Sequence, residues 1–237
     1  MPIRTREDFE KKEGSFLAPY ASKSRESLGR KHQENSHDFR TEFQRDRERI
    51  VHSSAFRSLE YKTQVPLSAS GDYVRTRLTH TIEVASISRS LSRSLGLNED
   101  LAEAIALGRD LGHPPFGHPV EHTLDQLMRD SGGFGRRRQS LRVVETLEVK
   151  YPEFNGLNLT HEVREGINPS PAPDTQPSLE SQSVDLADEI AHCCHDLEDA
   201  LESGLIDPSA LLGIELWKET ESGIRRNYTR LDPERTR

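Results

Sequence analysis

The chain has 237 residues, enough to bury a sizeable core, but only 32% of them are hydrophobic and 30% are charged. Its net charge of −8 does not provide the basic surface expected of a nucleic-acid-binding protein. No stretch approaches the roughly 20 apolar residues of a membrane-spanning helix, and the N-terminus lacks the apolar core of a signal peptide. We therefore expect a soluble protein that owes part of its stability to a metal ion or a partner subunit.

The two cysteines, Cys193 and Cys194, are adjacent in the sequence. Neighbouring cysteines are poorly placed for a structural disulfide, and their spacing is unlike that of zinc ligands. This pattern favours a reducing compartment, and we expect a cytoplasmic protein without a membrane partner.

Residues 1–38 are polar and show little periodicity, which predicts an irregular N-terminal arm. We expect residues 39–237 to form one helical domain with its core at about residues 60–205. A capping box at Thr41 and Gln44 predicts a helix that runs from there toward Leu59.

Residues 76–95 contain a helical stripe of apolar side chains, and Gly96 follows as a helix C-cap. His80 lies one turn before Val84 on this stripe. Asn98 is placed to cap the next helix, which we expect to close at Arg109 and Asp110, just before the turn of residues 112–118.

The rest of the chain also shows mainly helical patterns. Residues 129–138 predict a Gly/Arg-rich loop, residues 139–150 a helix, residues 167–180 an exposed Pro/Ser-rich loop, and residues 184–201 a further helix. Asp188, His192 and Asp196 form a polar stripe along that last helix at intervals of four residues. No alternating strand pattern is present, so the sequence predicts an all-α fold.

Chemistry-bearing residues gather in four places, which are His80, Asp110, the turn with His113 and His118, and the stripe on the last helix. Imidazole and carboxylate groups are the ligands of hard or borderline divalent metals, and helical proteins build such sites from inward side chains of separate helices. Such a metal could activate water and polarise a phosphoryl oxygen.

Each piece taken alone also has a purely structural interpretation. A single buried histidine such as His80 is more often hydrogen-bonded in the core than a ligand, and the polar stripe could be a solvated helix face. The turn Gly-His-Pro-Pro-Phe-Gly-His of residues 112–118 favours a functional site more strongly, because two prolines and two glycines between histidines impose a specific loop.

Nearly the whole chain resembles the deoxyguanosine-triphosphate triphosphohydrolase-like family of the HD superfamily. The resemblance rests on ordered blocks, namely FQRDRERIVHSSAFRSLEYKTQVPL, DYVRTRLTHTIEVA, LGRDLGHPPFGHPVEHTLD, RQSLRVVETLE, GLNLTHEVREGI and DLADEIAHCCHDLEDAL. It implies a multi-helix HD-domain architecture and a divalent metal ion. The activity that it implies is cleavage of a dNTP at the α-phosphorus to deoxynucleoside and triphosphate.

The resemblance also assigns roles to residues. It implies that the metal is held by His80, Asp110 and Asp188. It places His118 and Glu121, together with Asp110, in the catalytic chemistry. It implies that the substrate-binding residues are Gln64, Arg77, His113, His192 and Asp196.

Three positions depart from the family pattern. Arg109 stands where the family has a fourth metal ligand, a histidine, and a guanidinium has no lone pair to bind a metal. Arg136 stands where a catalytic histidine is expected, and His192 where the family commonly has a tyrosine that faces the substrate. The resemblance further implies a C-terminal helical region beyond Arg237, so we expect a fragment or a shortened paralogue.

Two main hypotheses follow. The first is a metal-dependent dNTP triphosphohydrolase, either active or weakened by the two arginines. The second is a catalytically silent nucleotide-binding paralogue in which Arg109, Arg136 and Arg137 supply the positive charge for triphosphate. Binding of single-stranded nucleic acid is the least favoured, since aromatic residues make up only 6% of the chain. The resemblance implies a homo-oligomer, often a hexamer.

Overall fold

The structure is a computed structural model that describes residues 3–63, 75–170 and 176–227. Within these ranges it contains helices and two isolated β-bridges, and no strand, which agrees with the predicted all-α fold. The α-helices are α1 (Arg6–Phe16), α2 (Glu42–Val51), α3 (Ser54–Ser58), α4 (Arg77–Leu95), α5 (Glu99–Arg109), α6 (His118–Leu127), α7 (Arg136–Arg142), α8 (His161–Ile167), α9 (Leu179–Glu202) and α10 (Glu215–Asn227). Shorter 3-10 turns cover Ser24–Glu26, Leu59–Tyr61, Arg129–Ser131 and Pro208–Gly213, and a π-helical turn covers Val143–Leu147.

The chain forms two compact units, residues 1–192 and residues 193–237. The first unit contains α1 to α8 and the first part of α9. The second contains the end of α9, the turn Pro208–Gly213 and α10, whose charged sequence leaves none of its residues buried.

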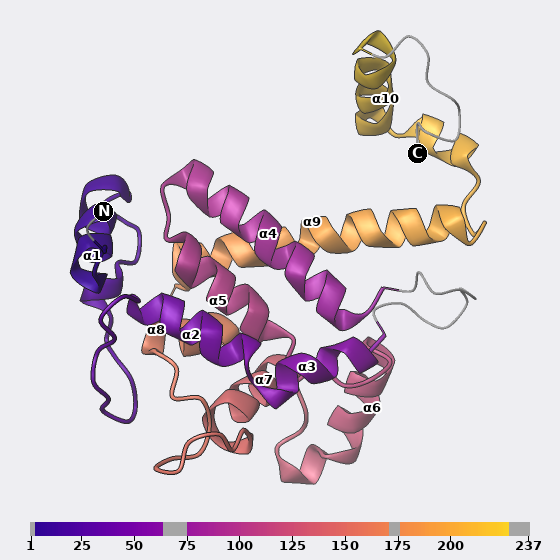
Figure 1. Ribbon diagram of the computed structural model, residues 1–237. Helices are drawn as coiled ribbons and strands as arrows, with labels where there is room; N and C mark the ends of the chain where they lie inside the picture. Colours follow the sequence, from indigo (N-terminus) through magenta and orange to yellow (C-terminus); the bar gives the residue numbers. More distant parts are fainter. Residues whose placement is uncertain (1–2, 64–74, 171–175, 228–237) are drawn as a thin grey trace. The chain divides into compact units, whose positions relative to one another are not determined.

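Helix α5 is the centre of the first unit, where it packs against α2, α4 and α8 (Figure 1). The predicted apolar face of α5 is buried, with Leu101, Ala104 and Ile105 fully enclosed. Gly108 on the same face allows close approach to α8, since a Cβ there would lie 2.6 Å from the side chain of Ile167. This packing fixes the C-terminal end of α5, where Arg109 and Asp110 lie.

Two predicted caps determine where α4 and α5 begin and end. Gly96 adopts a left-handed conformation with φ of 69° after α4, and the side chain of Asn98 accepts hydrogen bonds from the first backbone N–H groups of α5. The buried face of α4 is partly polar and includes Arg77, His80 and Thr81. This polar face is turned into the protein and supplies side chains to the candidate site.

The N-terminal arm that we expect to be irregular contains a helix, α1. Its first turn is capped by the Asp8 carboxylate, which accepts a 2.9 Å hydrogen bond from the Thr5 backbone N–H. Glu13 of α1 accepts hydrogen bonds from Ser24 and Asn98, which ties the helix to the start of α5. The sequence pattern missed α1 because no residue of the helix is buried, so it has no apolar periodicity.

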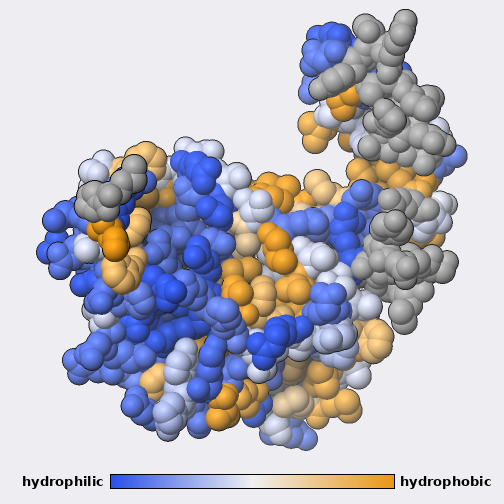
Figure 2. All heavy atoms as spheres, in the orientation of Figure 1, coloured by the Kyte–Doolittle hydropathy of each residue, from blue (hydrophilic) through white to orange (hydrophobic). Residues whose placement is uncertain are grey.

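Other element boundaries also differ from the predictions. The single helix expected from Thr41 toward Leu59 is interrupted at Ser53, whose hydroxyl accepts a hydrogen bond from the Phe56 N–H and starts α3. The predicted Gly/Arg-rich loop ends earlier than expected, because α7 begins at Arg136. Over α2 the surface is mostly hydrophilic (Figure 2), as its many charged residues require.

Candidate metal centre

Three side chains that can bind a metal come together from α4 and α9. These are His80, Asp188 and His192, whose potential ligand atoms all lie within 4.8 Å of one another. His80 Nε2 is 3.0 Å from Asp188 Oδ1, and the rings of His80 and His192 have centroids 4.9 Å apart. Asp188 and His192 share one face of α9 because they are four residues apart. The site therefore depends on the packing of α4 against the first part of α9.

The electrostatic surroundings keep Asp188 ionised. Burial acts to raise the pKa of its carboxyl group, but the hydrogen bond and charge of His80, together with the charges of His192 and Arg136, lower that pKa to about 2. His80 is only 1% exposed, so its imidazole is held away from bulk water. An ionised carboxylate and two imidazoles form a donor set that fits a borderline divalent cation.

Asp110 lies at the C-cap of α5 and reaches the same place. Together with His80, Asp188 and Arg109 it lines a small cavity of about 10 Å³, comparable to the space that one water molecule needs. Asp110 Oδ2 accepts a 3.3 Å hydrogen bond from Arg77 Nη1. The three predicted metal ligands, His80, Asp110 and Asp188, thus meet at one cavity, although Asp110 is not part of the closest group.

Arg109, at the position of the missing ligand, is bound by groups on α8 and α9. Its Nη1 lies 2.6 Å from Asp185 Oδ1, its Nη2 donates to the carbonyl and hydroxyl oxygens of Ser181, and its Nε donates to the Gly166 carbonyl. Arg137 Nη2 also lies 2.6 Å from Asp185 Oδ1. The guanidinium of Arg109 is therefore satisfied by neighbours other than the predicted metal ligands.

The turn after Asp110 is fixed by a close backbone approach at Gly112. A Cβ at Gly112 would lie 2.1 Å from the Ser140 backbone nitrogen, so only glycine fits. The Ser140 hydroxyl accepts from the Gly112 N–H and donates to the Arg109 carbonyl. α7 and its arginines are thereby held beside the end of α5.

Two of the three predicted catalytic residues, His118 and Glu121, form a second cluster with α7. Glu121 Oε1 accepts a 2.8 Å hydrogen bond from the Arg136 backbone N–H, and Glu121 Oε2 lies 3.5 Å from His118 Nδ1. The rings of His113 and His118 have centroids 6.2 Å apart. His118 is exposed, whereas His113 is buried. An exposed histidine beside a carboxylate is suited to proton transfer with a bound substrate.

His113 is neutral at physiological pH. Burial, together with the positive charges of Arg77 and Arg136, lowers its pKa to about 4, although Asp110 acts in the opposite direction. Its Nδ1 lies 3.1 Å from the Pro114 carbonyl oxygen and its Nε2 lies 3.4 Å from Arg136 Nη1. These contacts fit a ring that donates from Nδ1 and accepts at Nε2.

The structure does not place two of the predicted substrate-binding residues at this site. Gln64 lies outside the described residues, and Asp196 belongs to the second unit, so their roles stay predictions. The structure adds Asp185, which the sequence analysis missed although it lies one turn before Asp188 on α9. It also adds Lys62, whose Nζ donates a 3.4 Å hydrogen bond to the Leu111 carbonyl beside Asp110.

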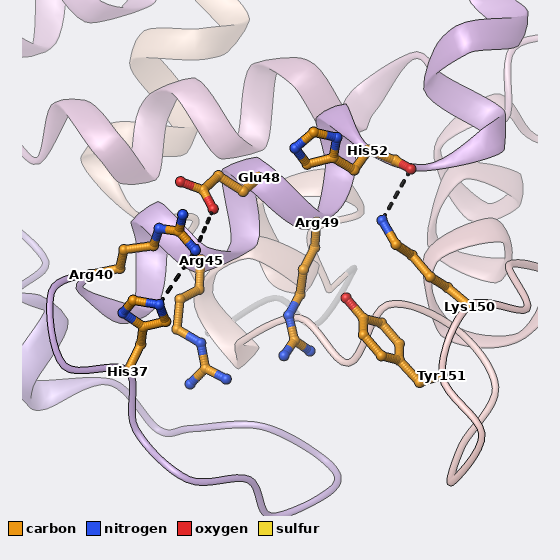
Figure 3. Close-up of a pocket in the computed structure, with 8 residues that line it drawn as sticks. All are labelled: His37, Arg40, Arg45, Glu48, Arg49, His52, Lys150 and Tyr151. Atoms are coloured by element: carbon orange, nitrogen blue, oxygen red, sulfur yellow. Dashed lines mark hydrogen bonds and ion pairs between the residues drawn. The ribbon is translucent and has the colours of Figure 1, made fainter.

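A basic pocket lies apart from this site, along α2 (Figure 3). Its cations are largely paired, since Arg49 makes two hydrogen bonds with Glu34 at 2.8 and 2.9 Å and Arg40 lies 3.0 Å from Glu48.

Of the described residues, only His80, Asp188 and His192 form a compact group of metal-binding side chains. The candidate metal centre is therefore the cavity between α4, α5 and α9. None of the described helices has the length and apolar character to cross a membrane.

Comparisons with known proteins agree with this geometry. The HD domain family matches residues 77–192, a range that includes His80, Asp110, Asp188 and His192. The chain is 52% identical to a deoxyguanosinetriphosphate triphosphohydrolase-like protein of Geobacter metallireducens, in an alignment that covers 94% of this chain and 61% of the relative. Proteins of the same description from Azoarcus sp. and Bordetella pertussis are 52% and 49% identical, over 92% of this chain and 61% and 62% of their own lengths.

The chain thus spans about three fifths of the length of these relatives. The matched region includes the cavity and the second cluster around His113 and Glu121. The chain therefore belongs to the HD-domain family, among the deoxyguanosinetriphosphate triphosphohydrolase-like proteins.

Proposed function

We propose that the protein is a metal-dependent hydrolase that converts a dNTP to deoxynucleoside and triphosphate. The observation that carries this proposal is the convergence of His80, Asp110 and Asp188 on one cavity, with Arg77 bound to Asp110 at its edge. Similarity to relatives described as dGTP triphosphohydrolase-like proteins supports the same substrate class.

The residues around the cavity supply the functions that such a reaction needs. A divalent ion held by His80, Asp110 and Asp188 would polarise a phosphoryl oxygen and lower the pKa of a water molecule. Arg77 and Arg136 provide positive charge for the triphosphate oxygens. Both lie close enough to His113 for their charges to lower its pKa.

The reaction transfers the triphosphoryl group, through its α-phosphorus, from the 5′ oxygen to water. The water oxygen forms a bond to the α-phosphorus, and the bond from that phosphorus to the 5′ oxygen breaks. One proton leaves the water and one reaches the departing 5′ oxygen. We assign proton transfer to His118 and Glu121, which lie 3.5 Å apart next to α7.

The test is product analysis. Purified protein is incubated separately with each of the four dNTPs and Mn²⁺, Co²⁺ or Mg²⁺, and the products are separated by ion-exchange chromatography. We expect equal amounts of triphosphate and deoxynucleoside, and loss of both in Asp188→Asn. The control variant is His122→Gln, because His122 is an exposed residue of α6 whose ring contacts Gln126. Release of pyrophosphate or phosphate instead of triphosphate would disprove the assigned reaction.

The second candidate is a catalytically silent nucleotide binder, which is favoured by the presence of Arg109 in place of a metal-binding histidine. Arg109 and Arg137 both pair with Asp185, whereas the Arg136 side chain lies beside His113. Of the three arginines, Arg136 is therefore the one that this hypothesis assigns to the triphosphate. A silent binder would bind a dNTP in equilibrium dialysis and release no triphosphate with any of these metals. Self-association as a homo-oligomer stays a prediction, which light scattering after size-exclusion chromatography would test.

A further inference from the structure

We infer that His192 is a metal ligand and that it takes the coordination place left by Arg109. This inference deepens the proposed function, because it rests on the presence of a metal ion at the His80–Asp188 site. The sequence analysis instead assigns His192 to the substrate. The geometry points to a different role, since His192 belongs to the closest group of donor atoms in the described part of the chain.

Distances support a shared ion. Zinc-like ions bind nitrogen and oxygen at about 2.0–2.2 Å, which places neighbouring ligand atoms about 3–3.5 Å apart. His80 Nε2 and Asp188 Oδ1 already lie 3.0 Å apart. The donor atom of His192 lies within 4.8 Å of both, so a small change of its side-chain torsions brings all three to one ion.

Helix geometry makes this arrangement stable. Asp188 and His192 are four residues apart on α9, and such pairs lie on the same face of a helix, one turn apart. His80 approaches that face from α4, and its ring lies 4.9 Å from the ring of His192 at an angle of 48°. Two elements thus supply an imidazole each, and α9 adds the carboxylate.

The metal site needs another ligand because Arg109 stands where the family has a histidine ligand. Its guanidinium has no lone pair, and its three nitrogens are bound to Asp185, Ser181 and the Gly166 carbonyl. It therefore adds no ligand at the end of α5, and Asp110 is partly engaged by Arg77. His192 restores a nitrogen ligand from α9, next to His80 and Asp188.

The resulting donor set also determines the class of metal. The imidazoles of His80 and His192, together with the carboxylates of Asp110 and Asp188, favour borderline transition metals such as Mn²⁺, Fe²⁺, Co²⁺ or Zn²⁺, whereas Mg²⁺ prefers oxygen ligands and water. We therefore expect tighter binding of Co²⁺ than of Mg²⁺. Removal of His192 should weaken the binding of Co²⁺ more than that of Mg²⁺.

The experiment is titration of the metal-free protein, residues 1–237, with Co²⁺ by isothermal calorimetry. His192→Gln should weaken Co²⁺ binding at least about tenfold, since even indirect supports of a metal site contribute 10- to 100-fold. His122→Gln should bind Co²⁺ like the parent protein, because His122 is exposed on α6. Circular dichroism of each variant establishes that the helices are intact. Equal Co²⁺ affinity of His192→Gln and the parent would overturn the inference, and so would a parent that binds no Co²⁺.

A ligand exchange gives a direct spectroscopic test. His192→Cys should keep Co²⁺ bound and add a near-ultraviolet charge-transfer band from thiolate to Co²⁺, because thiolate is itself a good ligand. The parent and His192→Gln contain the same Cys193 and Cys194, so they control for these cysteines. Absence of the new band at saturating Co²⁺ would place residue 192 outside the coordination shell.

These results separate the inference from the proposed function. His192-dependent Co²⁺ binding without release of triphosphate from any dNTP would support the metal ligand and contradict the proposed hydrolase. Triphosphate release together with Co²⁺ binding that is independent of His192 would support the hydrolase and overturn the ligand assignment.

Discussion

Arg109 and Asp185 form an ion pair at 2.6 Å that fixes an arginine at the end of α5 to the first part of α9. The Arg109 side chain is 7% exposed, whereas the Asp185 side chain is 38% exposed. Burial lowers the pKa of Arg109 and the Asp185 charge acts to raise it, so the pair keeps a buried guanidinium charged. The arginine thereby contributes to the packing that brings α9 and its Asp188 to the cavity.

Removal of the acid should destabilise the protein. In Asp185→Asn, Arg109 and Arg137 lose their shared carboxylate, and a mostly buried guanidinium is left with neutral partners. Because Asp185 is more than one third exposed, we expect a loss of only about 1–3 kcal/mol in the free energy of unfolding. Urea unfolding followed by circular dichroism measures this loss, with Asp130→Asn on an exposed turn as the control. A loss as small as that of the control would mean that water replaces Asp185.

Replacement of the arginine should improve metal binding. Arg109→His places an imidazole beside Asp110 at the cavity, and we expect Co²⁺ affinity to rise on the order of tenfold. Arg109→Gln is the matched control, because it removes the positive charge without adding a strong ligand. If both variants gain equally, relief of charge repulsion is the cause. If neither gains, the backbone at the end of α5 no longer presents residue 109 to the ion.

The basic pocket along α2 gives a pH-dependent prediction. Burial acts to raise the pKa of Glu34, but its hydrogen bonds with Arg49 and Asn158 and the charge of Arg49 outweigh this and lower the pKa below 4.5. A carboxyl group with a lowered folded-state pKa contributes stability above its unfolded-state pKa, and this contribution is lost as the pH falls through the folded-state value. The free energy of unfolding should therefore fall below about pH 4.5 less steeply in Glu34→Gln than in the parent. Parallel pH profiles of the two proteins would contradict this account.

Sequence patterns were reliable where a local rule determines the structure. Thr41 and Asn98 correctly predict where α2 and α5 begin, and Gly96 correctly predicts where α4 ends, because a cap acts within a few residues of the helix end. The apolar face of α5 was predicted because it is buried against several helices. Helix α1 was missed because its order comes from polar contacts of Glu13 with Ser24 and Asn98, which leave no periodic signal in the sequence.

At the candidate site, residue types could be predicted but their pairings could not. The family resemblance predicts that His80, Asp110 and Asp188 hold the metal, and these three residues line one cavity in the structure. The partner of Arg109 was not visible, because Asp185 lies 76 residues away and meets it only through the packing of α9 on α5. The proximity of His192 to His80 likewise depends on how α4 and α9 pack.

The two arginine departures give the last prediction, which distinguishes a weakened enzyme from a silent binder. Arg136 donates its backbone N–H to Glu121 and places its side chain 3.4 Å from His113, so a histidine there would lie within the cluster assigned to proton transfer. Arg109→His alone should improve metal binding with little gain in turnover. The double variant Arg109→His/Arg136→His should release triphosphate faster than the product of the two single effects, because a metal and a proton donor act on the same chemical step. The parent, the two single variants and the double variant are compared by initial rates at saturating Co²⁺ and dNTP.

A parent rate that neither substitution improves would show that Arg109 and Arg136 both contribute to the activity of the site. Tight dNTP binding by a parent that releases no triphosphate, lost in Arg136→Gln, would instead establish the silent binder.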